Sequence, residues 1–264
     1  MTHPGKSAPD LASYDVLLVN SSGGKDSQAM LDHVHHLAVA AGVAGRIVVV
    51  HCDLGRVEWE GTRDLAERQA AHYGHRVEVV RRTQNDLLDQ IAARGMFPSS
   101  TTRYCTSDQK RGPVRVLMTR LASEWRASSG LARPCRILNC MGLRADESSA
   151  RASKATYEPD AAASNGKRQV DTWLPIHAWT VDDVWARIRA SGVPHHRAYD
   201  LGMSRLSCVF CVLGRRSDLE IAARHNPALL DAYVAVEDRI GHTFTAKLSL
   251  RVLRDEARCA GGAS

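Results

Sequence analysis

Asp15–Ser27 reads DVLLVNSSGGKDS and decides the fold of this chain. The apolar run Asp15–Val19 has the length of a buried strand, and Ser27–Ala41 carries apolar residues at helical spacing. Ser21–Ser27 is therefore a Gly-rich turn from a strand into a helix. Two consecutive glycines let the backbone approach a phosphate closely, and the helix N-terminus and the lysine favour an anion there.

Strand-like and helix-like patterns continue to alternate beyond this turn. Further strands are predicted at 46–51, 76–80 and 136–141, and further helices at 62–73, 86–94 and 111–124. The alternation predicts an α/β fold with a doubly wound, mostly parallel, five-stranded Rossmann-like sheet. Ligands of such sheets bind at the carboxyl ends of the strands.

The domain organisation follows from where these patterns stop. A nucleotide-binding domain is predicted over 13–175, and a helical C-terminal region with a pair of cysteines over 176–250. Residues 151–170 lack periodicity and are predicted as a mobile loop. The ends, 1–12 and 251–264, are predicted to be flexible.

Composition excludes several classes of protein. The chain has 264 residues, of which 44% are hydrophobic and 24% charged, as in ordinary globular proteins. No apolar run reaches the roughly 20 residues of a membrane span, and the N-terminus has no secretory signature. A cytoplasmic location is expected.

The net charge of +6 is concentrated in one segment. The stretch from 103 to 136 has eight basic residues against two acidic ones. The basic residues are Arg103, Lys110, Arg111, Arg115, Arg120, Arg126, Arg133 and Arg136. Such a segment indicates an anionic partner, nucleic acid among them, or a solvated basic helix face.

Seven cysteines in a chain of this kind favour metal binding or catalysis over disulfides. Cys208-Val209-Phe210-Cys211 is a CxxC motif, which is compatible with zinc, a redox dithiol or an iron–sulfur cluster. No second CxxC is present, so further ligands would come from distant positions.

Several motifs resemble one known family. Ser22–Ser27 (SGGKDS) is similar to the pyrophosphate loop, SGGxDS, of the ATP pyrophosphatases, and Gly142–Ser148 (GLRADES) resembles a GxRxxES element. His51–Gly55 (HCDLG) follows a strand at which the family carries an acidic, Gly-containing turn. From about residue 14 to 245 the chain resembles the phosphoadenosine phosphosulfate (PAPS) reductase-like branch of the PP-loop, adenine nucleotide alpha hydrolase-like superfamily.

The resemblance implies a nucleotide site and its chemistry. The implied nucleotide-binding residues are Ser21, Ser22, Gly23, Gly24, Lys25, Asp26, Ser27, His51, Asp53, Gly142 and Arg144. The implied catalytic residues are Lys25, Asp26 and Arg144. ATP would bind together with Mg²⁺, for which Asp26 and Asp53 are the candidate ligands.

Two departures bear on the reaction. PAPS and APS reductases usually degrade the SGGxDS loop and carry a C-terminal Glu-Cys-Gly-Leu/Ile-His motif. This chain keeps the loop, and its last cysteine, Cys259, lies in RCAGGAS. These departures favour ATP-driven adenylation over reduction.

The segment around Cys105 resembles the part of APS reductases in which a tandem Cys-Cys, together with a later CxxC, holds a [4Fe–4S] cluster. Here Tyr104 replaces the first cysteine, and the spacing to Lys110 is one residue longer. Cys105, Cys208 and Cys211 remain as ligands, which would leave one iron open. Cys140, Cys52 or a histidine could be the fourth ligand; zinc, or unrelated buried cysteines, are the alternatives.

The sequence therefore predicts an ATP-dependent sulfurtransferase that adenylates an anionic acceptor and inserts sulfur. DNA or tRNA is the candidate acceptor; the sulfur donor is not indicated, and a homodimer remains an option. The first alternative is a PAPS or APS reductase that releases sulfite. The second is a non-catalytic subunit that senses nucleotide or associates with DNA.

Overall fold

The computed structural model describes residues 8–261, and these residues divide into two compact units. The first unit comprises 1–51, 63–80 and 114–195, and the second comprises 52–62, 81–113 and 196–264. The chain therefore passes between the units five times. This division differs from the predicted boundary at 175, because loops that leave the ends of strands join the second unit.

The first unit contains a six-stranded sheet in the order β3-β2-β1-β4-β6-β5. Its strands are β1 (Val16–Ser21), β2 (Ile47–Cys52), β3 (Arg76–Val80), β4 (Cys135–Cys140), β5 (Tyr157–Pro159) and β6 (Arg168–Trp173). β1 pairs in parallel with both β2 and β4, and β4 with β6, whereas β5 is antiparallel to β6. The predicted α/β fold with a mostly parallel sheet is confirmed, with six strands instead of five.

The two strands that the sequence patterns did not locate, β5 and β6, lie within and at the end of the segment predicted as a loop. β6 has no alternating pattern because its polar residues are buried with partners. Asp171 accepts a hydrogen bond from the Tyr14 hydroxyl at 2.7 Å, and Arg168 donates to the Ala163 carbonyl at 2.7 Å. Polar residues that are paired inside a sheet conceal a strand from hydropathy patterns.

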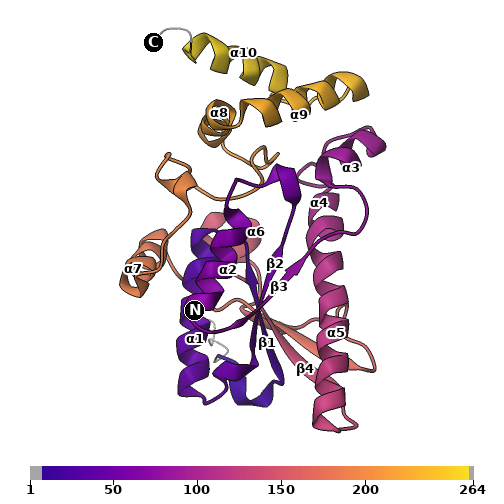
Figure 1. Cartoon of the computed structure of the whole chain (residues 1–264), viewed down its shortest axis with the longest axis vertical. Helices are drawn as coiled ribbons and strands as arrows, with labels where there is room; N and C mark the ends of the chain where they lie inside the picture. The colour runs from indigo at the N-terminus through magenta and orange to yellow at the C-terminus, as the bar shows by residue number, and fades with distance from the viewer. Residues whose placement is uncertain (1–7, 262–264) are drawn as a thin grey trace. The chain divides into compact units, whose positions relative to one another are not determined.

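Helices cover both faces of the sheet. Those of the first unit are α1 (Lys25–Ala40), α2 (Thr62–His72), α5 (Gly112–Ser129), α6 (Ser149–Ala152) and α7 (Val181–Ser191). Figure 1 shows α1 and α2 on one side of the sheet and α5 on the other. The apolar core includes Leu17 and Val19 of β1 and Met30 and Val34 of α1. This arrangement places the loop between β1 and α1 at the carboxyl end of a central strand.

The second unit is mainly helical and has a separate apolar core. Its helices are α3 (Leu87–Arg94), α4 (Tyr104–Thr106), the π-helical turn η4 (Ser107–Arg111), α8 (Arg216–His225), α9 (Pro227–Ile240) and α10 (Leu250–Gly261). Short 3₁₀ turns complete the chain: η1 (Leu11–Ser13), η2 (Ala44–Arg46), η3 (Gly55–Val57), η5 (Ala145–Glu147) and η6 (Arg197–Tyr199).

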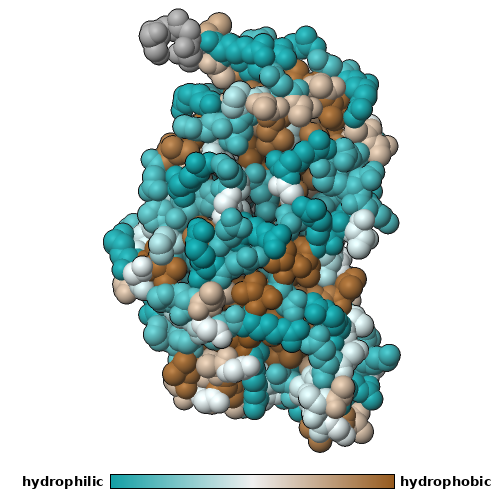
Figure 2. All heavy atoms as spheres, in the orientation of Figure 1, coloured by the Kyte–Doolittle hydropathy of each residue, from teal (hydrophilic) through white to brown (hydrophobic). Residues whose placement is uncertain are grey.

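Helix α10 occupies most of the tail that was predicted to be flexible. Leu250 and Leu253 are buried in the core of the second unit, while the other side of the helix is rich in arginine. Figure 2 shows mainly hydrophilic residues over α10. Its narrow apolar stripe explains why the sequence pattern missed it. Residues 1–7 and 262–264 of the predicted flexible ends lie outside the described residues.

Among residues 8–261, no helix combines the length and the apolar character that crossing a bilayer requires.

Candidate functional site

The Gly-rich loop connects β1 to α1 within the first unit. Gly23 has a φ of 69°, which a glycine adopts without strain. Ser27 Oγ accepts a hydrogen bond from the Ser22 N–H at 3.1 Å and donates to the Gly24 carbonyl at 2.9 Å. The first N–H groups of α1 have no partner within the helix, as at every helix start. The loop is thus a fixed turn whose donors suit an anion.

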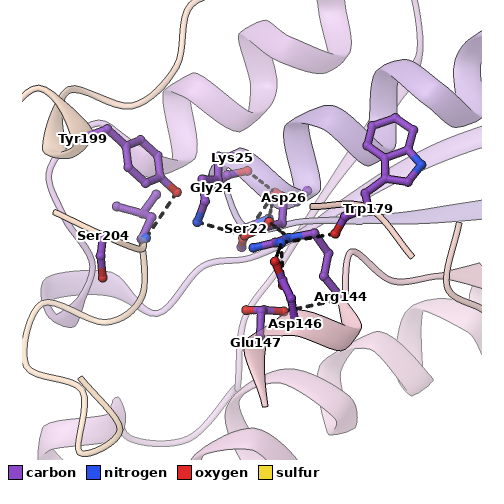
Figure 3. A network of polar contacts seen from close by, with 12 residues as sticks. Ser22, Gly24, Lys25, Asp26, Arg144, Asp146, Glu147, Trp179, Tyr199 and Ser204 are labelled. Carbon is purple, nitrogen blue, oxygen red and sulfur yellow. Dashed lines mark hydrogen bonds and ion pairs between the residues drawn. The ribbon is translucent and has the colours of Figure 1, made fainter. Parts of the chain in front are cut away.

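Charged side chains beside this loop form one network, shown in Figure 3. Lys25, with its side chain 6% exposed, places Nζ 3.3 Å from Asp26 Oδ2. Arg144 Nε lies 2.6 Å from Asp26 Oδ1, and Arg144 Nη1 lies 2.5 Å from Asp146 Oδ1. Arg144 also donates to the Trp179 carbonyl at 3.3 Å. Asp26 therefore holds Lys25 with one oxygen and Arg144 with the other.

The charge state of Arg144 follows from these partners. Burial lowers the pKa of its guanidinium, but Asp26 and Asp146 raise it more, so the net pKa lies above its usual value. Arg144 is a permanent, oriented cation in the same network as Lys25. Such a cation can bind phosphate oxygens without reorganising.

Gly142 allows the end of β4 to approach the loop. A Cβ at this position would lie 3.0 Å from the Asp26 carbonyl oxygen and 3.2 Å from the Ser27 nitrogen. Both contacts are to backbone atoms, which cannot rotate away. The glycine is needed for close packing rather than for a special φ.

His51 lies at the end of β2 and is 1% exposed. Its Nδ1 is 3.0 Å from the carbonyl oxygen of Ser21, the residue at which the loop begins. The structure thus places His51, Ser21–Ser27, Gly142 and Arg144 close together, while their role in nucleotide binding stays a prediction.

Asp53 belongs to the second unit. Its carboxylate accepts a hydrogen bond from the Gly55 N–H at 2.8 Å and lies 3.1 Å from Arg81 Nη2. It lines a cavity of about 430 Å³ in that unit, together with Arg56, Arg81 and Asp86.

The two candidate magnesium ligands are already engaged. Asp26 is held by Lys25 and Arg144, and Asp53 by Arg81. A divalent cation would have to displace these cations, so the carboxylates as they stand do not fit Mg²⁺.

Cys105, Cys208 and Cys211 all belong to the second unit, and all are free thiols. Cys208 interacts electrostatically with Cys211 and Cys105. Burial raises the pKa of Cys208 to about 12, against the opposing effect of Lys110. A hydrogen bond of 2.9 Å from the Val209 N–H to the Val57 carbonyl fixes the CxxC turn.

Lys110 is an electrostatic neighbour of Cys208, Cys52 and Cys211. Burial lowers the pKa of its ammonium, but Cys208, Cys52 and Cys211 raise it more, in that order, so the net pKa is raised. Cys52 also reaches Lys110 with its thiol, which lies 3.8 Å from the Lys110 carbonyl oxygen. Burial raises the pKa of Cys52 to about 11. The sequence had marked Lys110 as part of a basic segment and of the resemblance around Cys105, but not as a neighbour of Cys52.

The π-helical turn explains the longer spacing between Cys105 and Lys110. A π-helical turn accommodates an extra residue within a helix, and this one spans Ser107–Arg111. Lys110 consequently stays beside the thiols. Tyr104, at the position of the missing cysteine, is buried and donates its hydroxyl to the Met96 carbonyl at 2.6 Å.

Cys140 is placed differently from the other candidate ligands. It is fully buried in the core of the first unit, at the end of β4, and burial raises its pKa. Cys52, in contrast, shares the second unit with Cys105, Cys208 and Cys211. Within the described part of the chain, no three His, Cys, Asp or Glu side chains are grouped to hold a single metal ion.

The basic segment does not form one surface. It is divided between the units at 113 and 114, and several of its charges are neutralised. Arg120 pairs with Glu78 at 2.5 Å, and Arg133 with Asp15 at 2.7 Å. Arg103 and Arg111 are exposed and have no ion pair among the described residues.

Comparisons with known proteins identify the family to which the chain is similar. Residues 16–213 match the family model of the phosphoadenosine phosphosulfate reductase domain. An uncharacterized 37.8 kDa protein of Escherichia phage 186 is 32% identical over 159 residues, which cover 60% of this chain and 44% of that protein. An adenosine 5'-phosphosulfate reductase of Allochromatium vinosum is 28% identical over 163 residues, covering 60% and 56% respectively.

A solved structure is similar as well. A phosphoadenylyl-sulfate reductase from Candida auris has a TM-score of 0.48 at 18% identity, covering 75% of this chain and 83% of that one. The chain spans about half the length of the two curated relatives described above. The chain belongs to the phosphoadenosine phosphosulfate reductase domain family, within the PP-loop, adenine nucleotide alpha hydrolase-like superfamily.

Proposed function

We propose that this protein is an ATP-dependent sulfurtransferase, which adenylates an anionic acceptor and then replaces the adenylated oxygen with sulfur. The observation that carries the proposal is the complete loop with Lys25 and Arg144 held by Asp26. A buried lysine beside a helix N-terminus suits the phosphates of an intact triphosphate. The relatives named adenosine 5'-phosphosulfate reductase support sulfur chemistry on an adenine nucleotide.

The first step is adenylation. The N–H groups of the loop and Lys25 bind the β and γ phosphates, and Arg144 binds the α phosphate. An oxygen of the acceptor attacks the α phosphorus, and the bond to the β-phosphate oxygen breaks. The products are the acceptor–AMP ester and pyrophosphate. Lys25 and Arg144 stabilise the charge that develops on the phosphate oxygens.

The second step is substitution by sulfur. A sulfide attacks the acceptor atom that carries the adenylated oxygen, and AMP leaves with that oxygen. No electrons are gained or lost overall. The sulfide source is a separate donor.

The described residues offer no group of three side chains for a single metal ion, so we assign the cysteines of the second unit to a larger group. The ammonium of Lys110 interacts electrostatically with Cys208, Cys52 and Cys211 and offsets negative charge there, and Cys105 is in turn an electrostatic neighbour of Cys208. The hydroxyl of Tyr233, a further electrostatic neighbour of Cys208 and Cys211, is buried and has no hydrogen-bond partner among residues 8–261. Cys105, Cys208 and Cys211 would hold a [4Fe–4S] cluster, which supplies an iron site for sulfide.

Exposed charge in the second unit supports an anionic acceptor. Arg103 and Arg111 flank Cys105 and Lys110 in sequence, and Arg205 and Arg215 flank the CxxC motif. None of the four forms an ion pair among the described residues, whereas Arg216 and Arg258 nearby in the same unit do. Unpaired arginines are available for phosphates, and DNA or tRNA is the acceptor class we propose.

The test is an anaerobic incubation with ATP, a sulfide donor, and either DNA or tRNA. Release of pyrophosphate and AMP that depends on the acceptor, with sulfur found in the recovered nucleic acid, is expected. Lys25→Ala should abolish pyrophosphate release, while Lys167→Ala, an exposed lysine of the same unit, should not. ATP that stays intact with every acceptor would refute the proposal.

A reductase is the second candidate, because one exposed thiol is available. Cys259 lies on α10 and is exposed, as a nucleophile must be. Sulfite released from APS or PAPS with a thiol donor, and lost in Cys259→Ser, would establish this reaction in place of sulfur transfer.

A further inference from the structure

Tyr233 is a buried residue whose hydroxyl is unsatisfied. It lies on α9, is 1% exposed, and its Oη has no hydrogen-bond partner among the described residues. A buried hydroxyl without a partner is unfavourable, because it has given up its hydrogen bonds to water. An acceptor that the polypeptide does not provide would account for it.

The surroundings of Tyr233 direct its ring toward the CxxC motif. Its ring centroid lies 5.3 Å from that of Phe210, in an edge-on arrangement, and 6.4 Å from that of Phe97. Phe210 is the residue directly before Cys211. The electrostatic neighbours of the phenol include Cys208 and Cys211. Two aromatic contacts thus fix the ring beside the residue that precedes Cys211, and the two thiols act on the phenol more strongly than Asp86 and Arg56 do.

We propose that Tyr233 is a positioning residue for the group that Cys208 and Cys211 hold, donating its hydroxyl hydrogen to a sulfur of that group. The acceptor is a metal-bound thiolate or an inorganic sulfide. This inference rests on the iron–sulfur cluster of the proposed function.

Charge explains why the hydroxyl is unpartnered in the polypeptide alone. Neutral thiols are weak acceptors, whereas a thiolate or sulfide carries negative charge and accepts a stronger hydrogen bond. Donors to cluster sulfurs stabilise the extra electron of the reduced state, so they raise the reduction potential. Tyr233 would therefore favour the reduced cluster.

The experiment compares the full-length protein with Tyr233→Phe, both purified anaerobically. Iron and acid-labile sulfide should be equal in the two proteins, since no ligand is removed. At a fixed potential, the ratio of reduced to oxidised cluster should fall about tenfold in the variant, on the scale of one hydrogen bond to a charged acceptor. Tyr157→Phe, which removes a partnered hydroxyl in the first unit, should leave this ratio unchanged.

A measurement on the wild-type protein covers the case of a poorly folded variant. After exchange into D₂O, pulsed EPR of the reduced cluster should show coupling to an exchangeable deuteron, which Tyr233→Phe should lack. Wild-type protein without iron and sulfide would refute the cluster, and this inference with it. A loaded variant whose potential and deuteron coupling match wild type would refute only the role of Tyr233, leaving its hydroxyl to a buried water.

Discussion

The Gly-rich loop of the first unit and the cysteine group of the second differ in how completely their polar atoms are satisfied. Lys25, Asp26, Arg144 and Asp146 neutralise one another in one chain of ion pairs. Around the cysteines, the Tyr233 hydroxyl has no partner, and exposed arginines such as Arg103 and Arg111 have no carboxylate partner, within the part of the chain that the structure describes. The charged groups of the loop are already paired with one another before any ligand binds. The cysteine group has polar groups that a bound ligand would pair.

The difference has a consequence for mutation. A substitution in the loop network breaks interactions that already exist, so it should affect both stability and chemistry. A substitution among the cysteines removes ligands from a group bound later, so the fold of the first unit should survive it. The following predictions test this contrast, beginning with the largest expected effect.

Cys208→Ser should remove almost all iron, because a buried thiol of the CxxC motif is lost. ATP binding by the first unit should stay within about twofold of wild type, because Cys208 belongs to the second unit and the residues of the nucleotide loop to the first. Iron and sulfide assays and nucleotide titration measure the two effects. Cys135→Ser, a buried cysteine of the first unit, is the control and should keep full iron content.

Arg144→Lys should reduce pyrophosphate formation about 100-fold, because a lysine cannot contact Asp26, Asp146 and a phosphate at once. Steady-state pyrophosphate release measures it. Arg126→Lys alters an exposed arginine of α5 and should have no effect. Equal rates for wild type and Arg144→Lys would show that the ion-pair network is only structural.

The same contrast explains how much could be predicted from sequence. The Gly-rich loop could be predicted because Ser21–Ser27 is one contiguous motif. Arg144 could be predicted because it follows β4 within a second short motif. The cysteine group could be predicted only in part, because Cys52, Cys105 and Cys208 come from separate stretches of sequence that the fold brings into one unit. Tyr233 had no signal at all: a tyrosine at helical spacing looks like any core residue until its hydroxyl is found unpartnered.

The ion pairs were equally hidden from sequence. Nothing local to Arg120 or Arg133 shows that Glu78 and Asp15, from other strands and turns, neutralise them. Net charge counted along the chain therefore overstated the basic surface of α5. β6 and α10 were missed because paired polar residues and a narrow apolar stripe gave them no clear periodicity.

Gly142→Ala should destabilise the first unit by about 1 kcal/mol and weaken ATP binding several-fold, because its Cβ would press on the backbone of Asp26. Thermal unfolding and nucleotide titration measure the change. Gly45→Ala is the matched control, with no atom within 4 Å of its added Cβ. An unchanged ATP affinity in Gly142→Ala would contradict the prediction, because it would mean that the backbone of the Gly-rich loop moves to accommodate the added Cβ.

Removing unpaired charge should weaken acceptor binding. Arg103→Gln combined with Arg111→Gln should lower affinity for nucleic acid about tenfold and flatten its salt dependence. The paired arginines Arg216 and Arg258 provide the control: the double variant Arg216→Gln, Arg258→Gln removes the same charge but should cost less affinity. Equal losses in the two double variants would indicate binding by net charge alone.

The smallest effect concerns pH. Burial, reinforced by His35, whose Nδ1 lies 3.0 Å from its Nε2, lowers the pKa of His75 to about 4. In the unfolded chain the pKa is about 6.5, so between these values the unfolded state binds more protons. Stability should therefore fall as pH decreases from 6.5 to 4.

His75→Gln should reduce this slope, by at most one proton, in unfolding curves recorded across the range. His225→Gln, an exposed histidine of the second unit, should leave the slope as it is. A steeper slope in His75→Gln would contradict the assignment.

Because the chain passes between the two units five times, cleavage of a single peptide bond cannot separate one unit from the other. The second unit begins with Cys52, the last residue of β2, and is completed only when α10 has been synthesised. Its contacts join residues far apart in sequence, which slows folding. A ribosome-bound fragment that stops before 196 would carry the nucleotide loop but only Cys52 and Cys105 of the cysteine group, so sulfur chemistry becomes available last.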